Sequence, residues 1–173
     1  MMLASHVGEI ARLWLLIAVL VAACGKSLAF GRFCRDLAAS FPELGKAGAP
    51  LAAAIVAIEW VLAVLLLSGG TVLRVGFIGT ALLFTALTAV VAVALAQDRT
   101  VVCSCFGTAS HRMSGYDLLR NGVLVGAAVF GVFAPPVVGL DAFSHIALAG
   151  IALIAFQLSV GLQDIVAVLR IRV

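Results

Sequence analysis

The sequence has 173 residues, of which 64% are hydrophobic and 11% are charged, and its mean hydropathy is +1.25. A chain of this length cannot bury so much apolar surface in one soluble core, so the composition predicts an integral membrane protein. The net charge of +3 comes without a basic stripe, and the sequence has no phosphate-binding or metalloprotease motif. We therefore expect no nucleic-acid partner and no cofactor.

Five apolar segments are long enough to cross a bilayer as helices, which takes roughly 20 residues each. They lie at about 10–28, 50–68, 73–96, 118–133 and 142–161. Runs such as LAVLLL do not alternate apolar and polar residues, as the strands of a membrane β-barrel do. We predict an all-α, polytopic membrane helix bundle of about five transmembrane helices, forming a single membrane domain over residues 1–173. The longest connections, at 29–49 and 97–117, leave little room for a soluble domain.

The first segment contains Cys24 at the end of the run LVAAC, a pattern that also precedes lipidated cysteines. A cleaved signal is the alternative to a retained helix. Because the apolar run continues past Cys24 to Phe30, we expect the segment to remain as a transmembrane helix. A free cysteine in such a helix is usually a small buried apolar side chain.

The two connections carry the other thiols: Cys34 lies in GRFCRD, and Cys103 and Cys105 lie in VCSCFG. The arginines beside Cys34 favour its thiolate, which is the reactive form. Two cysteines separated by one residue suit a dithiol that closes to a strained, readily reduced disulfide. They equally suit a soft-metal site for Cu(I) or Zn, in which Cys34 and Cys24 are further candidate ligands. A purely structural role is the third interpretation.

The neighbours of the thiol pair fit an exposed turn at the membrane surface. Phe106 is expected to anchor the turn at the interface, and Gly107 to supply a bend that a larger residue resists. Cys34, on a connection expected to move, is the candidate resolving thiol. His111 and His145 have no metal-ligand spacing between them, and we expect neither to belong to a site.

Glu59 lies near the middle of the second apolar segment, where an isolated carboxylate costs several kcal/mol. It must therefore be protonated or paired. Lys26 near the end of the first segment is the first candidate partner, and Arg120 at the start of the fourth is the second. A structural contact between helices and a role in proton movement both fit this residue.

Glycines spaced along the third and fourth segments are typical of close helix packing in membranes. Gly76 with Gly79, and Gly122 with Gly126, are the candidate contact positions.

The run CSCFG at 103–107, followed by Arg120–Asn121 at the start of a helix, resembles the pattern of the MauE family of methylamine-utilisation membrane proteins. Gly25–Lys26 and Glu59 resemble that family's Gly-Lys pair and its second-helix glutamate. Ser104 is a departure, because the family usually has glycine there, which puts the shape of the turn in doubt but removes neither thiol.

The resemblance implies a four-helix core like that of the DoxX-like redox-associated proteins, with one additional helix. It also implies a membrane protein that helps to form or handle disulfides while a partner matures, with a thioredoxin-like or other redox protein as a second partner. Lys26, Glu59, Arg120 and Asn121 are the supporting residues that it implies. Cys24 and Cys34 are not part of the family pattern. Besides soft-metal binding or transport, a small structural subunit of a larger membrane complex is the remaining alternative.

Basic residues favour the cytoplasmic side of a membrane when they flank the helices. Five spans place nine of the eleven on one face, together with the cysteine connections, and leave Arg12 and Arg74 on the other. We expect a multi-pass protein of the cytoplasmic membrane with its N-terminus outside and the VCSCFG loop inside. A maturation factor for secreted disulfides would expose its thiols outside, but the charge bias is the stronger physical argument.

The sidedness is tested by thiol labelling of intact cells with a membrane-impermeant maleimide. In a variant with Cys24→Ser and Cys34→Ser, the two remaining thiols should react only after the cells are permeabilised. Reaction of Cys103 from outside intact cells would contradict the expected orientation.

Overall fold

A computed structural model describes the backbone of residues 2–97, 102–103, 111–112, 115–135 and 142–171. Side chains are described at 4–97, 115–135 and 143–161. The long helices are α1 (Met2–Leu28), α3 (Gly48–Leu67), α4 (Gly70–Ala96), α5 (Gly115–Phe133) and α6 (Ala142–Ile171). Each of these five helices is long and apolar enough to cross a membrane. The predicted all-α, polytopic bundle is therefore confirmed, and the chain is a multi-pass membrane protein.

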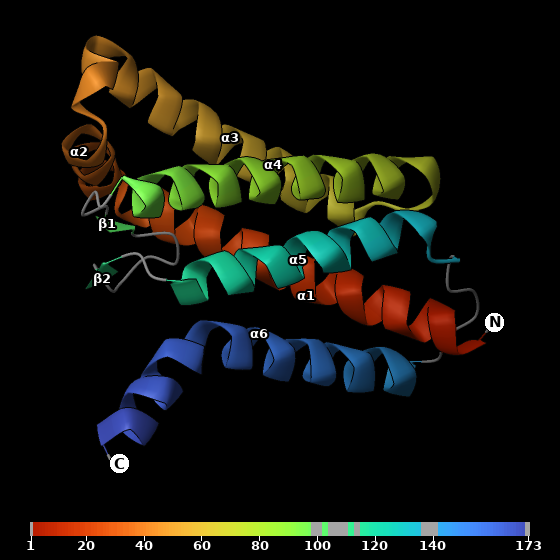
Figure 1. The fold of residues 1–173 in the computed structure, drawn as a ribbon. Helices are drawn as coiled ribbons and strands as arrows, with labels where there is room; N and C mark the ends of the chain where they lie inside the picture. The colour runs from red at the N-terminus through yellow and green to blue at the C-terminus, as the bar shows by residue number, and fades with distance from the viewer. Residues whose placement is uncertain (1, 98–101, 104–110, 113–114, 136–141, 172–173) are drawn as a thin grey trace.

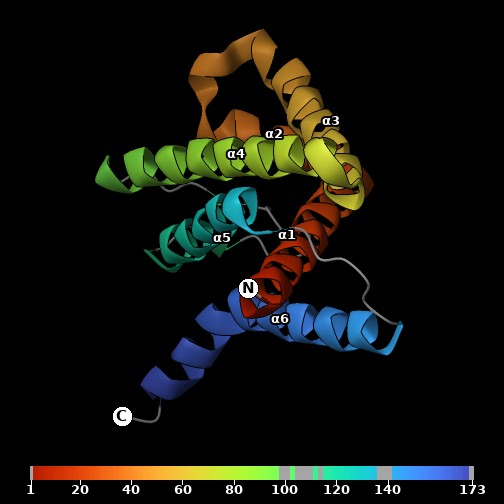
Figure 2. The same ribbon diagram turned by 90° about the vertical axis from the view of Figure 1, so that its right-hand side faces the viewer.

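Helix α1 lies at the centre of the bundle (Figures 1 and 2). It packs against α3, α5 and α6, while α4 packs against α3 and most extensively against α5. Helix α6 is attached mainly through α1, and in Figure 2 it lies on the side of α1 away from α3 and α4. Helix α1 therefore connects α3, α5 and α6, which are far apart in the sequence.

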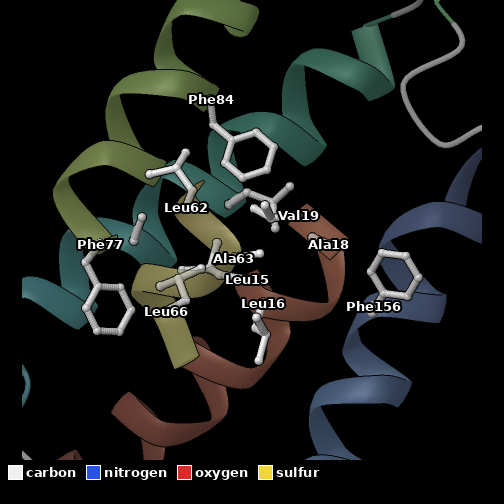
Figure 3. Packing of buried hydrophobic residues seen from close by; sticks show 12 residues of the cluster. Leu15, Leu16, Ala18, Val19, Leu62, Ala63, Leu66, Phe77, Phe84 and Phe156 are labelled. Carbon is white, nitrogen blue, oxygen red and sulfur yellow. The ribbon is translucent and has the colours of Figure 1, made fainter. Parts of the chain in front are cut away.

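The core follows from the spacing of the buried residues on each helix. On α3, Glu59, Leu62, Ala63 and Leu66 are buried and recur at intervals of three and four residues, which places them on one face. Large apolar residues on the opposite faces, such as Val64, remain exposed, as expected for lipid contact. Figure 3 shows the cluster that results; it contains Leu15, Leu16, Ala18, Val19, Leu62, Ala63, Leu66, Phe77, Phe84, Leu124, Ala128 and Phe156.

The first connection is folded into helices rather than left as a loop. Helix α2 (Phe30–Ser40) is followed by the 3-10 helix η1 (Pro42–Ala47). Proline disfavours helical geometry in the residue before it, which explains why α2 stops at Ser40 and Phe41 is non-helical. None of the residues of α2 is fully buried, so hydropathy alone gives little sign of this helix. The expectation of a loop around Cys34 is wrong, because Cys34 lies within α2.

The second connection contains a short antiparallel ladder between β1 (Val102–Cys103) and β2 (His111–Arg112). Cys103 is opposite His111 in its register. Figure 1 shows both strands at the same end of the bundle as α2.

Close approach of helices occurs at some of the predicted glycines and not at others. A Cβ atom on Gly76 would lie 3.0 Å from the backbone carbonyl carbon of Leu65, so α4 meets the backbone of α3 there. Gly131 on α5 makes similar room for the ring of Phe77 on α4. Gly122 is exposed and has no atom within 4 Å of such a position, and Gly126 is the same. The expectation that these last two glycines make helix contacts within the bundle is wrong, because they lie on the outer face of α5.

A leucine tests this distinction between the glycines. Gly76→Leu should destabilise the protein by about 1–3 kcal/mol, because the new side chain meets backbone atoms that cannot rotate away. Gly122→Leu is the matched control and should not lower stability. The free energy of unfolding in mixed detergent micelles measures both. Equal destabilisation by the two substitutions would contradict close packing of α4 against α3 at Gly76.

Candidate functional site

We call the end of the bundle formed by the last turn of α1, by α2 and η1, and by β1 and β2 the thiol end. Helix α2, which carries Cys34, contacts β1, which carries Cys103. The two segments lie together in Figure 1 although they come from different connections. Two of the predicted thiol positions are thus on neighbouring segments of backbone.

The predicted pairing of Glu59 with Lys26 is confirmed. The ammonium Nζ of Lys26 donates a hydrogen bond to Oε1 of Glu59 at 2.5 Å. Only 4% of the Lys26 side chain and 3% of the Glu59 side chain are exposed. Packing of α1 against α3 brings the two residues together, and their opposite charges offset part of the cost of removing each from water. This is a desolvated ion pair inside a membrane bundle.

A second contact ties α1 to α3 at the same level. The indole Nε1 of Trp60 donates a hydrogen bond to Oγ of Ser27 at 3.1 Å. The residues following Lys26 and Glu59 in the sequence are therefore also paired, and this fixes the relative height of the two helices.

Lys26 also connects this pair to α2. Its ammonium group lies 5.7 Å from the centre of the Phe33 ring, which is the distance of a cation–π contact. Phe33 directly precedes Cys34. The second carboxylate oxygen of Glu59, Oε2, is buried and has no hydrogen-bond partner among the described residues. Lys26 of the ion pair thus contacts α2, and Glu59 keeps one carboxylate oxygen that can still accept a hydrogen bond.

A second buried charged pair lies in the first turns of α5. Arg120 Nη2 is 3.2 Å from Oδ1 of Asp117, and both side chains are less than a tenth exposed. The carboxylate of Asp117 also lies near the positive end of the helix dipole. Asn121 is buried beside them. Sequence reasoning missed Asp117, although its spacing of three residues from Arg120 on a predicted helix was a usable signal.

The remaining predicted site residues are only partly described. Cys24 is exposed, so the expectation of a small buried side chain there is wrong, because this residue lies on the outer face of α1. Cys34 is half-buried on α2. For Cys103 the structure gives the backbone of β1, and Cys105, Phe106 and Gly107 lie outside the described residues.

Metal-ligating side chains do not gather in the part of the chain with described side chains. Among these residues, no group of three or more His, Cys, Asp or Glu could hold a metal ion. The paired thiols lie outside that search, so the soft-metal interpretation of Cys103 and Cys105 stays a prediction.

A family model described as "Methylamine utilisation protein MauE" matches residues 4–134, which cover α1 to α5 with both cysteine connections. The chain belongs to the MauE family. In this MauE-family protein the match includes the Lys26–Glu59 pair, whereas α6 lies beyond it. No curated protein and no solved structure matches the chain.

The ion pair makes a prediction about stability. Lys26→Met or Glu59→Leu alone should cost about 3–5 kcal/mol, because each leaves one buried charge without its partner. The double variant should lose much less, because both charges are gone and the volumes are similar.

Unfolding titrations in mixed micelles measure this double-mutant cycle. Lys46→Met, which removes an exposed cation from η1, is the control and should change stability by less than about 0.5 kcal/mol. Additive losses in the double variant would show that the two residues do not act as a pair.

Proposed function

We propose that this MauE-family protein is a membrane thiol/disulfide redox protein that assists disulfide formation or handling in a partner during its maturation. The observation that carries the proposal is the contact between α2, with Cys34, and β1, with Cys103. A bundle with few polar groups has two cysteine-bearing segments folded against each other at one end. The description of the family favours a partner from methylamine utilisation.

The chemistry proposed is thiol–disulfide exchange. A thiolate of the partner attacks the disulfide between Cys103 and Cys105, forming a mixed disulfide and releasing one thiolate of the pair. The second thiol of the partner then attacks the mixed disulfide, so the partner gains a disulfide and the pair is reduced by two electrons and two protons. A disulfide-bearing thioredoxin-like protein reoxidises the pair by the reverse exchange.

Cys34 is the proposed resolving thiol: it attacks a mixed disulfide that persists on Cys103, which forms a disulfide between Cys34 and Cys103 and releases the partner as a thiolate. Cys34 is half-buried on α2, and α2 contacts β1, which carries Cys103. Cys24 is exposed on α1, a helix that packs mainly against other helices rather than against β1, and is the weaker candidate.

The polar residues around the thiol end are proposed to support its geometry. The buried ammonium group of Lys26 contacts Glu59 on α3 and the Phe33 ring on α2, and in this way it holds α1, α2 and α3 together. Arg120 and Asn121 do the same at the start of α5, next to the end of the cysteine connection. Phe106 and Gly107 are proposed to shape the turn that presents the thiols. The charge bias favours a cytoplasmic thiol end in the inner membrane.

The decisive experiment counts thiols in purified protein under a metal chelator. After mild oxidation, the wild type should lose two titratable thiols, and dithiothreitol should restore them. In a Cys34→Ser background, which removes the neighbouring thiol, Cys103→Ser and Cys105→Ser should each abolish the reversible loss as completely as the double variant, because half of a redox pair cannot cycle. Cys24→Ser is the control and should keep it.

Function in cells is measured on a co-expressed methylamine-utilisation protein that contains disulfides, by counting its disulfides. The double serine variant should lower the rate at which they form. Formation at the normal rate would reject the thiol mechanism and favour a structural subunit. If the thiol count is repeated with Cu(I) or Zn in place of the chelator, thiols that then become unreactive toward the titrant would favour the soft-metal alternative.

A further inference from the structure

The end of the bundle opposite the thiol end contains a cavity of about 610 Å³. It is open on part of its surface and is lined by the first turns of α1, the turn between α3 and α4, the end of α5 and the start of α6. Figure 1 shows these four regions together at the end where the N-terminus lies. Cavities of this volume are typical of sites for small molecules.

Charged side chains line the cavity and give it a positive balance. Arg12, Arg74 and His145 line it together with Glu9, which is the one carboxylate among its described lining residues. Glu9 and Arg12 form an ion pair at 2.5 Å, so one positive charge is already balanced. Arg74 has no ion pair among the described residues and so adds a further positive charge, and His145 adds an ionisable ring.

Arg12 is held in position but is not saturated. Its Nη2 donates to Glu9 Oε1, and its Nη1 donates to the backbone oxygen of Leu66 at 3.4 Å. Its Nε is buried and has no hydrogen-bond partner among the described residues. A guanidinium group has five N–H donors, so the two hydrogen bonds that Arg12 makes leave other donors for a ligand.

The first turn of α4 also opens into the cavity. Gly69, Gly70 and Thr71 line it, and because the N-cap residue is Gly69 it has no side chain that could cap the N–H groups of this turn. The amide groups of the first turn of a helix carry a partial positive charge and bind anions. The helix terminus thus adds to the effect of the two guanidinium groups.

The remaining wall is apolar. Leu73, Phe77 and Pro135 line it. The cavity therefore has a cationic part and an apolar part, which suits a ligand with an anionic group joined to a less polar body.

We propose that this cavity binds a phosphate group, held between Arg12, Arg74 and the first turn of α4. Guanidinium groups match phosphate oxygens through paired hydrogen bonds. The volume exceeds what a free phosphate fills, and the site lies at the end of membrane-spanning helices. The same chemistry is offered by the headgroup of an anionic phospholipid and by soluble phosphate.

The test uses the full-length protein in nanodiscs and separates these two sources. The lipid arm compares discs of phosphatidylcholine with discs that also contain phosphatidylglycerol, and native mass spectrometry counts the phosphatidylglycerol that stays on the protein. The phosphate arm titrates inorganic phosphate into phosphatidylcholine discs and measures heat. Far-UV circular dichroism checks that each variant is folded.

Arg74→Gln is the test variant, because Arg74 is exposed and has no described ion pair to lose. It should weaken binding about ten-fold or more in whichever arm binds. Lys46→Gln is the matched control, because it removes one exposed positive charge at the other end of the bundle, and it should leave binding unchanged. Retention in the lipid arm alone identifies a headgroup site, and heat in the phosphate arm identifies a site open to free phosphate. Binding in neither arm, or equal weakening by both variants, overturns the proposal.

Discussion

The fold of this MauE-family protein depends on one buried ion pair, between Lys26 of α1 and Glu59 of α3. A carboxylate in the middle of a membrane helix costs several kcal/mol unless a partner offsets the cost. The position of the partner is therefore restricted: α1 must pack against α3 with Lys26 at the level of Glu59 and turned toward it. The central position of α1, in contact with α3, α5 and α6, extends that restriction to the rest of the bundle. Through the Phe33 ring the same ammonium group also positions α2 and the thiol end.

Charged side chains with described contacts lie at both ends of the bundle, and they give the two ends different chemistry. Near the thiol end, the charges of Lys26 and Glu59 and of Asp117 and Arg120 balance within buried pairs. At the opposite end, Glu9 balances Arg12, and Arg74 adds a further positive charge to the cavity. Balanced pairs suit a positioning role beside the proposed reactive thiols, whereas a net positive charge suits the binding of an anion. The proposed redox function and the proposed phosphate site therefore do not compete for the same residues.

Sequence reasoning identified features whose cause lies within one segment. Hydropathy found the five long helices, and the cost of an isolated carboxylate identified Lys26 as a partner of Glu59. It missed features that need the relative rotation of helices: Gly76 packs against α3, whereas Gly122 faces outward, although both lie in similar runs. It also missed α2, because an amphipathic helix without buried residues resembles a polar connection. The cavity was not predictable, because its walls come from four separate parts of the chain.

The most direct measurement of the central claim is the rate at which Cys34 and Cys103 form a disulfide when both Cys24 and Cys105 are serine. Copper-phenanthroline supplies the oxidant, and mass spectrometry counts the cross-linked peptide. The ion pair is expected to hold α2 against β1, so the cross-link should form rapidly with Glu59 present and at least several-fold more slowly in Glu59→Leu, while Lys46→Met leaves the rate unchanged. A cross-link that never forms, or that forms equally fast without Glu59, would contradict the claim that the buried pair positions the thiol end.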